Sequence, residues 1–208
     1  MIHLASGPAV TPVSVSPAWW GSLAAVSAVL LAVAVILVVG IARGRITMEL
    51  GPGRSWLPLR ERRVSIAAPP EIVIGVLREA ARGTIPGITA RERTVVLEES
   101  GDLVVNESVN DSRFGMVRAR EAVHFDPHGR VTYRHLSGPL PGTEENFDVR
   151  DTDQGSELAY RGRIAVDFGS LGRLVARSLI LPEYERLLDL HIAALTKTCE
   201  TRARRRQG

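Results

Sequence analysis

The sequence predicts an α+β protein in which a curved antiparallel sheet of about seven strands surrounds a long C-terminal helix, preceded by one transmembrane helix. Three observations support this fold class. The chain begins with a long uncharged apolar stretch, its middle consists of strand-like runs joined by short turns, and its end repeats apolar residues at helical spacing. A sheet that surrounds a helix encloses space, and we expect that space to be the functional site.

The apolar stretch runs from Trp19 to Ile41 and contains no charged residue. At about 1.5 Å of rise per residue it can cross a bilayer core of roughly 30 Å. The indole rings of Trp19 and Trp20 suit the membrane interface at one end. A cleaved signal peptide is the main alternative, but it would need a basic residue before the apolar run and a cleavage site after it. We therefore predict a retained transmembrane helix over residues 19–42.

The charges around this helix predict its orientation. No Lys or Arg precedes the span, whereas Arg43 and Arg45 follow it directly. Basic residues favour the cytoplasmic side of a membrane. The predicted protein is therefore a single-pass protein of the cell membrane, with its N-terminus outside and its main domain in the cytoplasm.

The segments that flank the span lack regular apolar patterns. Residues 1–18 are small, polar and proline-containing, and we expect them to be disordered. Residues 43–59 carry glycines and prolines that interrupt regular structure, which is typical of a linker. The soluble domain is then expected over residues 60–202, with a basic tail over residues 203–208.

The first half of the soluble domain predicts one strand, one helix and then only strands. Alternating apolar residues indicate a strand over 64–68, and Pro70 opens a helix that Gly83 ends. Six strand-like runs follow, each separated from the next by turn residues. They cover 93–99, 102–111, 115–126, 130–137, 143–151 and 156–167. Short connections between consecutive strands predict an antiparallel meander.

The C-terminal stretch, from Phe168 to about Arg204, predicts one long helix or two helices that meet at Pro182. Pro182 lacks an amide hydrogen and disturbs the preceding turn, so we expect a kink near Ser178. The apolar face of this helix should lie against the sheet. Its members before the proline are Leu171, Leu174, Val175, Leu179 and Leu181, and those after it are Tyr184, Leu187, Leu188, His191, Ile192 and Leu195.

Three segments resemble a known family. The opening RRVSIAAPPEIVIGVLREAARG, the strand pair SGPLPGTEENFDV and the final helix LGRLVARSLILPEYERLLDLHIAALTKTCE are similar to the START-like (helix-grip, SRPBCC) superfamily, in its polyketide cyclase/dehydrase and lipid transport branch. The resemblance covers residues 60–202 and consists of apolar and turn patterns. It implies a helix-grip fold with a hydrophobic pocket. The family includes lipid carriers, hormone binders and cyclases, so the fold alone does not decide the function.

The alternation along each strand predicts which residues line the pocket. The candidates on the sheet are Val105, Ala119, Tyr133, Phe147 and Tyr160, and those on the last helix are Leu179, Tyr184, Leu188 and His191. Glu107, Glu121, His135 and Glu145 share the inward position. The first three of these are candidate catalytic residues, because a carboxyl or imidazole group that faces an apolar cavity can act as acid or base. The alternative is that these polar residues pair with neighbouring arginines at the strand ends.

Other kinds of site find little support in the sequence. His124, His128 and His135 are close together, but no carboxylate or cysteine completes a metal site, and no nucleotide-binding or nucleophile motif occurs. We therefore expect no cofactor and no metal. Cys199 is the only cysteine, which excludes an intramolecular disulfide.

The basic tail is the last candidate for a contact surface. Its arginines are Arg202, Arg204, Arg205 and Arg206. Beside a membrane anchor they suit anionic lipid, and a solvated helix end is the alternative. We expect no binding to nucleic acid.

Three functional hypotheses remain open after the sequence. In the first, the domain binds or carries a hydrophobic small molecule, either lipid-like or polycyclic, at the membrane. In the second, it is a polyketide cyclase or dehydratase that uses a pocket carboxylate or histidine. In the third, it is a noncatalytic, membrane-tethered interaction module with a filled core. The sequence favours the first hypothesis, because no acid–base constellation stands out in it.

Overall fold

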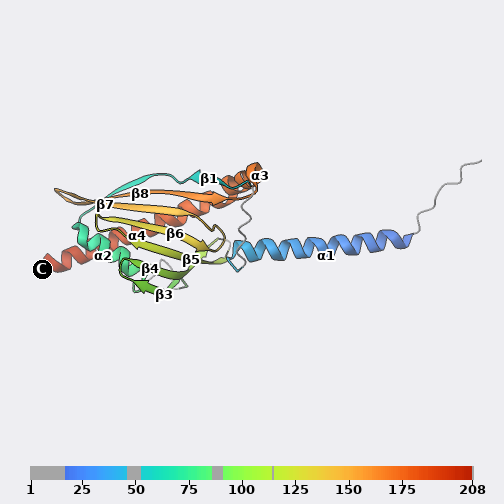
Figure 1. The fold of residues 1–208 in the computed structure, drawn as a ribbon, viewed down its shortest axis with the longest axis horizontal. Coiled ribbons are helices and arrows are strands. Elements are labelled where there is room, and N and C mark those ends of the chain that lie inside the picture. The colour runs from blue at the N-terminus through green and yellow to red at the C-terminus, as the bar shows by residue number, and fades with distance from the viewer. Residues whose placement is uncertain (1–16, 46–52, 86–90, 114, 208) are drawn as a thin grey trace, which may run out of the picture. The chain divides into compact units, whose positions relative to one another are not determined.

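The computed structural model describes residues 17–45, 53–85, 91–113 and 115–207 (Figure 1). It divides into two compact units, Met1–Val38 and Val39–Gly208. The first contains most of helix α1 (Pro17–Ala42), and among the described residues α1 alone is long and apolar enough to cross a membrane, over Trp20–Ile41. Most of the predicted disordered segment and residues 46–52 of the predicted linker lie outside the described residues.

The second unit is organised around an eight-stranded antiparallel sheet with the strand order β1-β8-β7-β6-β5-β4-β3, and β2 also pairs with β8. The strands are β1 (Ser55–Pro58), β2 (Arg62–Ile66), β3 (Arg93–Ser100), β4 (Leu103–Ser112), β5 (Gly115–Phe125), β6 (Arg130–Ser137), β7 (Glu144–Thr152) and β8 (Gly155–Val166). Each strand from β3 to β8 pairs with the next one in the chain, which confirms the predicted meander.

Strand β1 is the element that the sequence did not predict, because it lies inside the expected linker. Leu57 pairs with Ile164 of β8, and the side chains of Leu57 and Leu59 are only 3% and 4% exposed. Pro58 cannot donate a hydrogen bond to a neighbouring strand, but β1 lies at the edge of the sheet, where a proline is tolerated. The folded unit therefore includes residues that we expected to be linker.

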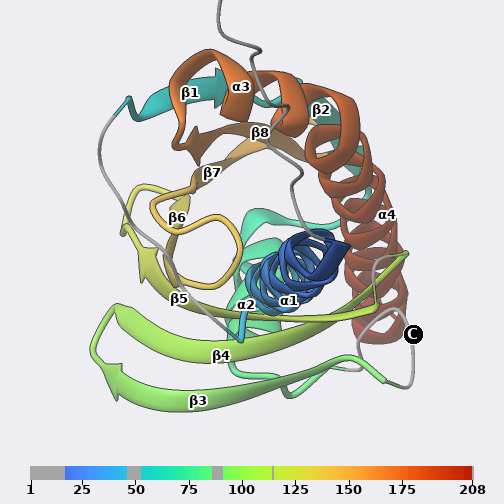
Figure 2. The same ribbon diagram turned by 90° about the vertical axis from the view of Figure 1, so that its right-hand side faces the viewer.

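Helix α2 (Pro70–Ala81) begins where the sequence predicts, with a proline in its first turn. Its apolar face is Ile72, Val73, Val76 and Leu77, all of which are buried in the core. Gly83 follows with a φ of 68°, a left-handed conformation that glycine adopts without strain. This helix and the C-terminal helix lie on the concave side of the curved sheet (Figure 2).

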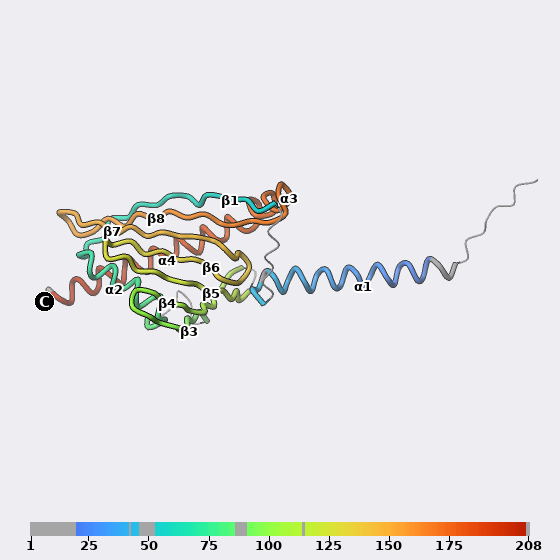
Figure 3. Tube along the Cα trace, viewed as in Figure 1, coloured from blue at the N-terminus to red at the C-terminus, as the bar shows by residue number. Residues whose placement is uncertain are grey.

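The C-terminal helix is continuous from α3 (Gly169–Val175) through the π-helical turn η1 (Ala176–Ile180) into α4 (Leu181–Gln207), as the Cα trace shows (Figure 3). The predicted disturbance near Ser178 takes the form of this π-helical turn, which ends at Ile180, two residues before Pro182. Ala203 is buried, so the packed part of α4 extends beyond residue 202.

The core forms where α4 and α2 meet the sheet. Leu188, Ile192, Cys199 and Ala203 of α4 recur on one face and are all buried. The observed architecture confirms the predicted α+β fold class, a curved antiparallel sheet that holds a long C-terminal helix.

Candidate ligand-binding site

A cavity of about 510 Å³ lies between α4, α2 and the strands β3 to β7. Its volume falls within the usual range for small-molecule sites, roughly 300–1,000 Å³. Leu77, Ala80 and Ala81 line it from α2, and Leu187, Leu188 and Ile192 line it from α4. The sheet contributes both apolar and polar side chains. The cavity is thus apolar along its helices and mixed along its sheet.

Seven of the twelve candidate site residues from the sequence line this cavity, and so does Glu145, which shares their inward position. The seven are Glu121, Tyr133, His135, Phe147, Tyr184, Leu188 and His191. The parity predicted for β5, β6 and β7 is therefore correct. His191 lies at the exposed side of the cavity, and its Nδ1 is 2.8 Å from the carbonyl oxygen of Leu187.

The parity predicted for β4 is wrong. Asn106 and Ser108 face the cavity, whereas Val105 and Glu107 lie on the opposite face of the strand. The Glu107 carboxylate pairs there with Arg118 at 3.4 Å and with Arg120 at 3.3 Å. We misassigned β4 because its inward positions are polar where they line the cavity, so the more apolar set of side chains points outward.

Three further candidates lie away from the cavity lining. Ala119 is buried beside Gly138 and does not line the cavity. Tyr160 is 1% exposed and packs behind Phe147, with its ring centroid 5.0 Å from that of Phe147. Leu179 is 52% exposed and belongs to η1.

A polar row crosses the sheet at the base of the cavity. Asn106, Glu121 and His135 are direct neighbours on β4, β5 and β6. His135 Nε2 lies 3.7 Å from Glu121 Oε1 and 3.5 Å from Glu145 Oε2. Tyr184 Oη on α4 is 3.3 Å from the same nitrogen. The imidazole of His135 therefore lies beside two carboxyl groups and one phenol in a mostly buried environment.

Hydrogen bonds from neighbouring strands orient both carboxyl groups. Tyr160 Oη donates to Glu145 Oε1 at 2.7 Å, and Ser108 Oγ donates to Glu121 Oε1 at 3.1 Å. Tyr160, which the sequence predicts in the cavity lining, therefore lies behind the lining and orients Glu145.

The two carboxyl groups have opposite pKa shifts. Burial raises the pKa of Glu121, although the nearby His135 partly opposes this shift. Burial also acts against ionisation of Glu145, but its contacts with His135 and the tyrosine hydroxyls outweigh burial and lower its pKa. Burial disfavours the charged form of His135, yet Glu145 and Glu121 together raise its pKa. The surroundings therefore favour the ionised forms of His135 and Glu145 and disfavour ionisation of Glu121, which separates the acid–base properties of the two carboxyl groups.

Asn106 adds an acceptor that has no partner. Its Nδ2 donates to the carbonyl oxygen of Ala81 at 2.8 Å, and this bond fixes the orientation of the amide. The side chain is 1% exposed, and its Oδ1 is one of two buried polar side-chain atoms without a hydrogen bond among the described residues. A buried acceptor of this kind is costly unless a donor reaches it. Sequence reasoning missed Asn106; polar residues at alternate β4 positions, Asn106, Ser108 and Asn110, were the available signal.

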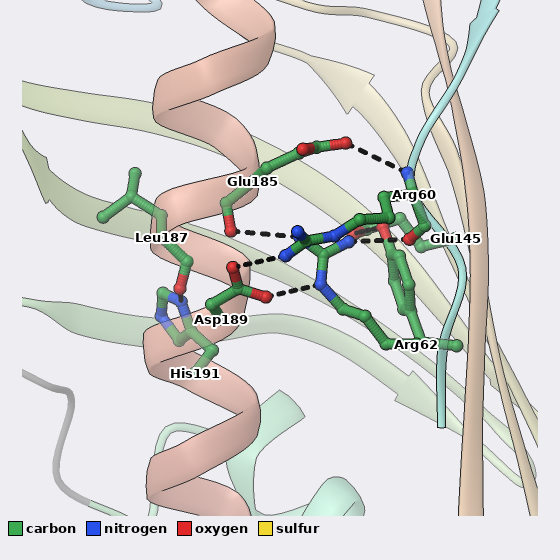
Figure 4. A network of polar contacts seen from close by, with 8 residues as sticks. Arg60, Arg62, Glu145, Glu185, Leu187, Asp189 and His191 are labelled. Carbon is green, nitrogen blue, oxygen red and sulfur yellow. Dashed lines mark hydrogen bonds and ion pairs between the residues drawn. The ribbon is translucent and has the colours of Figure 1, made fainter. Parts of the chain in front are cut away.

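An ion-pair network holds α4 against β2 on the outer side of the site (Figure 4). Arg62 Nε lies 2.5 Å from Asp189 Oδ1, and Arg60 Nη2 lies 2.9 Å from Asp189 Oδ2. The backbone nitrogen of Arg60 donates to Glu185 Oε1 at 3.0 Å. The Arg62 guanidinium also lies over the Tyr160 ring, 5.7 Å from its centroid. Through Arg62 this network connects Tyr160, which supports Glu145 from behind, to helix α4, which forms one wall of the cavity.

Comparison with known proteins identifies the architecture. No family model matches the sequence, and no curated protein matches it significantly. Several solved structures do match the fold. The Zhui aromatase/cyclase from Streptomyces sp. R1128 has a TM-score of 0.61 at 19% identity, over 71% of this chain and 96% of that one.

Two other matches extend the comparison. The di-domain ARO/CYC StfQ from the steffimycin biosynthetic pathway has a TM-score of 0.54 at 17% identity, over 71% of this chain and 52% of that one. Ara h 8.0201 has a TM-score of 0.54 at 11% identity, over 72% of this chain and 98% of that one. The chain therefore has the helix-grip fold. These identities are too low to transfer a function with it.

Proposed function

We propose that this domain binds a hydrophobic small molecule in the cavity between α4 and the sheet. The observation that carries the proposal is the cavity itself, about 510 Å³ of space with apolar walls on both helices. A domain that served only as an interaction module would have no need of such a space, because protein cores normally pack to high density. Fold-level likeness to aromatase/cyclases supports the same class of ligand.

The polar row indicates that this ligand also carries oxygen or nitrogen groups. Burying about 250 Å² of apolar ligand surface contributes roughly 6 kcal/mol. Loss of translational and rotational freedom costs a similar amount, on the order of 4–15 kcal/mol. Polar contacts must therefore add to the affinity. Asn106 Oδ1 offers an acceptor, and the Glu121 carboxyl, whose pKa burial raises, offers a donor in its protonated form. A polycyclic molecule with hydroxyl and keto groups fits this combination better than a plain hydrocarbon chain does.

Native mass spectrometry of the full-length protein, extracted from membranes in mild detergent, tests the proposal. We expect a co-purified small molecule at one per chain, released on denaturation. Leu188→Trp should reduce its occupancy because it fills part of the cavity. Leu190→Trp is the matched control, since Leu190 is 40% exposed on the same helix. A wild-type protein that is empty and that also takes up no added polycyclic phenol would contradict the proposal.

Acid–base catalysis, as in a cyclase or dehydratase, is the second candidate function. It is favoured by the single imidazole of His135 that contacts two carboxyl groups with opposite pKa shifts. Such a pair can deliver a proton to a carbonyl oxygen and remove one from carbon. If the domain is an enzyme, Glu121→Gln should abolish turnover and retain binding. If the domain is a carrier, the same change should leave delivery of the ligand intact.

The proposal also includes the location of the protein in the cell. We infer that residues 19–42 anchor the chain in the cell membrane and that the ligand-binding domain faces the cytoplasm. The apolar length of α1 and the arginines that follow it support this orientation. Protease added outside intact cells should then spare the domain, and its digestion there would reverse the topology.

A further inference from the structure

Helix α3 and the turn η1 expose large apolar side chains at one end of the domain. Leu171, Leu174 and Leu179 are 68%, 63% and 52% exposed, and Phe168 and Val175 beside them are 62% and 43% exposed. We call these five residues the α3 patch. No residue of α3 is buried. Single exposed apolar residues are common on soluble proteins, but five of them within three helical turns are not.

The way α3 packs explains why these side chains point outward. Gly172 lies so close to β8 that an added Cβ would collide with the carbonyl oxygen of Asp167 and approach the side chain of Val166. Ala176, one turn further along, is fully buried. The helix thus packs through the small residues Gly172 of α3 and Ala176 of η1, and its large residues cover the opposite side. Our expectation that Leu171, Leu174, Val175 and Leu179 pack against the sheet is therefore wrong, whereas Leu181 does pack against the core.

Charge indicates which surface the α3 patch fits. From Phe168 to Pro182 the chain contains no Asp or Glu, and its only charged residues are Arg173 and Arg177, both of which are exposed. Leucine and phenylalanine beside exposed arginines are typical of helices that lie in the interface of a membrane with anionic lipid. A protein partner that covered this surface would have to supply acidic groups around an apolar centre.

Chain connectivity limits how far the α3 patch can lie from a membrane that holds the apolar helix. Gly169 N, at the start of α3, donates to the carbonyl oxygen of Gly53 at 3.2 Å, and Arg54 Nε is 3.0 Å from Asp167 Oδ1. Gly53 and Arg54 therefore lie directly beside the start of α3, while Arg43, at the end of the apolar helix, accepts a hydrogen bond from the backbone nitrogen of Arg118 on β5 at 3.2 Å. At about 3.4 Å per residue, the extended chain from Ile41 to Gly53 spans at most roughly 40 Å. A bilayer that holds Trp20–Ile41 is within reach of the patch.

We propose that the α3 patch inserts into the interface of an anionic bilayer and fixes one end of the domain to the membrane. The proposed transmembrane anchor would keep the α3 patch close to the bilayer, and this is the only way in which the inference depends on that anchor. Its own attraction to lipid comes from its apolar side chains and from Arg173 and Arg177. The proposal is independent of what the cavity binds.

An environment-sensitive label on the full-length protein tests this inference. In a Cys199→Ala background, the fluorophore NBD is attached to Leu174→Cys, or to Leu190→Cys as a control with an exposed leucine on α4. The protein is reconstituted into vesicles of equal parts phosphatidylcholine and phosphatidylglycerol, with or without doxyl-labelled lipid as a quencher. We expect a blue shift and lipid-dependent quenching at position 174 and neither at position 190. Arg173→Gln combined with Arg177→Gln should reduce both signals at position 174.

Three results would overturn the inference. In the first, the label at position 174 stays in a water-like environment. In the second, lipid quenches the labels at positions 174 and 190 equally, and that result indicates non-specific adhesion. A blue shift without lipid quenching that disappears when the protein is diluted among vesicles indicates a second copy of the chain on the patch. Alkaline washing of the same vesicles reports separately whether the chain is anchored. Loss of the chain on washing would refute the anchor, while quenching before the wash would still support the patch.

Discussion

Glu121 and His135 are direct cross-strand partners on β5 and β6, with His135 Nε2 3.7 Å from Glu121 Oε1. On its other side the imidazole lies 3.5 Å from Glu145 Oε2. Burial opposes ionisation of both carboxyl groups, but Glu145 accepts hydrogen bonds from His135 and from Tyr160, whereas Glu121 accepts one from Ser108 and is only attracted by the charge of His135. This asymmetry explains why the two carboxyl groups have opposite pKa shifts although they share one histidine.

Replacing Glu121 with glutamine should stabilise the fold at neutral pH. Because burial raises the pKa of Glu121, the folded chain keeps a proton that the unfolded chain releases above the ordinary range for glutamate. Stability therefore falls as pH rises from that range towards the folded pKa. Glu121→Gln cannot titrate, so its advantage over wild type should grow with pH, to on the order of 1 kcal/mol. Urea unfolding measures the difference at two pH values, about 4.5, which is close to the ordinary glutamate pKa, and about 8, which is well above it.

Glu107→Gln is the matched control, because Glu107 pairs with Arg118 and Arg120 on the outer face of the neighbouring strand. Removing this carboxylate should destabilise the domain by about 0.5–1 kcal/mol at pH 8, which is the opposite sign. An advantage of Glu121→Gln that is the same at both pH values would mean that Glu121 is not held neutral.

A fragment that starts at Gly53 should be more stable than one that starts at Arg60. The shorter fragment loses β1 and the buried side chains of Leu57 and Leu59. Burying a leucine contributes about 1.5–3 kcal/mol, so the loss of two should be roughly 3–6 kcal/mol. Urea denaturation of the two fragments measures it. Within the longer fragment, Leu57→Ala should cost about 2–5 kcal/mol. Equal stability of the two fragments would show that β1 is not part of the folding unit.

Arg202 should stabilise the fold through Glu79 rather than bind lipid. Its two Nη atoms lie 2.7 Å and 2.6 Å from the carboxylate oxygens of Glu79 on α2. Both side chains are about one-third exposed, so a double-mutant cycle should give a coupling of roughly 0.5–1 kcal/mol. Vesicle binding should be unchanged by Arg202→Ala and weakened by replacing Arg204, Arg205 and Arg206 together. Zero coupling, with vesicle binding that depends on Arg202, would restore the role we first expected for it.

The strand order and the C-terminal helix could be predicted from the sequence because their signals are local. Turn residues separate every pair of strands from β3 to β8, and the apolar spacing in α4 continues over many turns. Strand β1 could not be predicted in this way. It has four residues, includes Pro58 and is held in place by β8, which is more than a hundred residues away in the chain.

The site was predicted less completely because cavities reverse the usual patterns. Along β4 the inward residues Asn106 and Ser108 are polar and the outward Val105 is apolar, so hydrophobic alternation indicates the wrong face. In α3 and η1 the small residues Gly172 and Ala176 face inward, and their small size gives little hydrophobic signal. In both cases the inward residues are too polar or too small to mark the buried face, so only the folded chain shows the orientation.

If the cavity takes up apolar ligands, the fragment 53–208 should bind the fluorescent probe 1-anilinonaphthalene-8-sulfonate there, and a titration measures this binding. Ala80 lines the cavity from α2, whereas Ala193 lies outside it on α4. The same change, alanine to phenylalanine, can therefore be made at both positions. We predict that Ala80→Phe weakens probe binding at least about tenfold, equivalent to 1.4 kcal/mol, while Ala193→Phe leaves it unchanged and both variants still melt cooperatively. Equal probe affinity in the wild type and in a folded Ala80→Phe variant would contradict uptake of apolar ligands by this cavity.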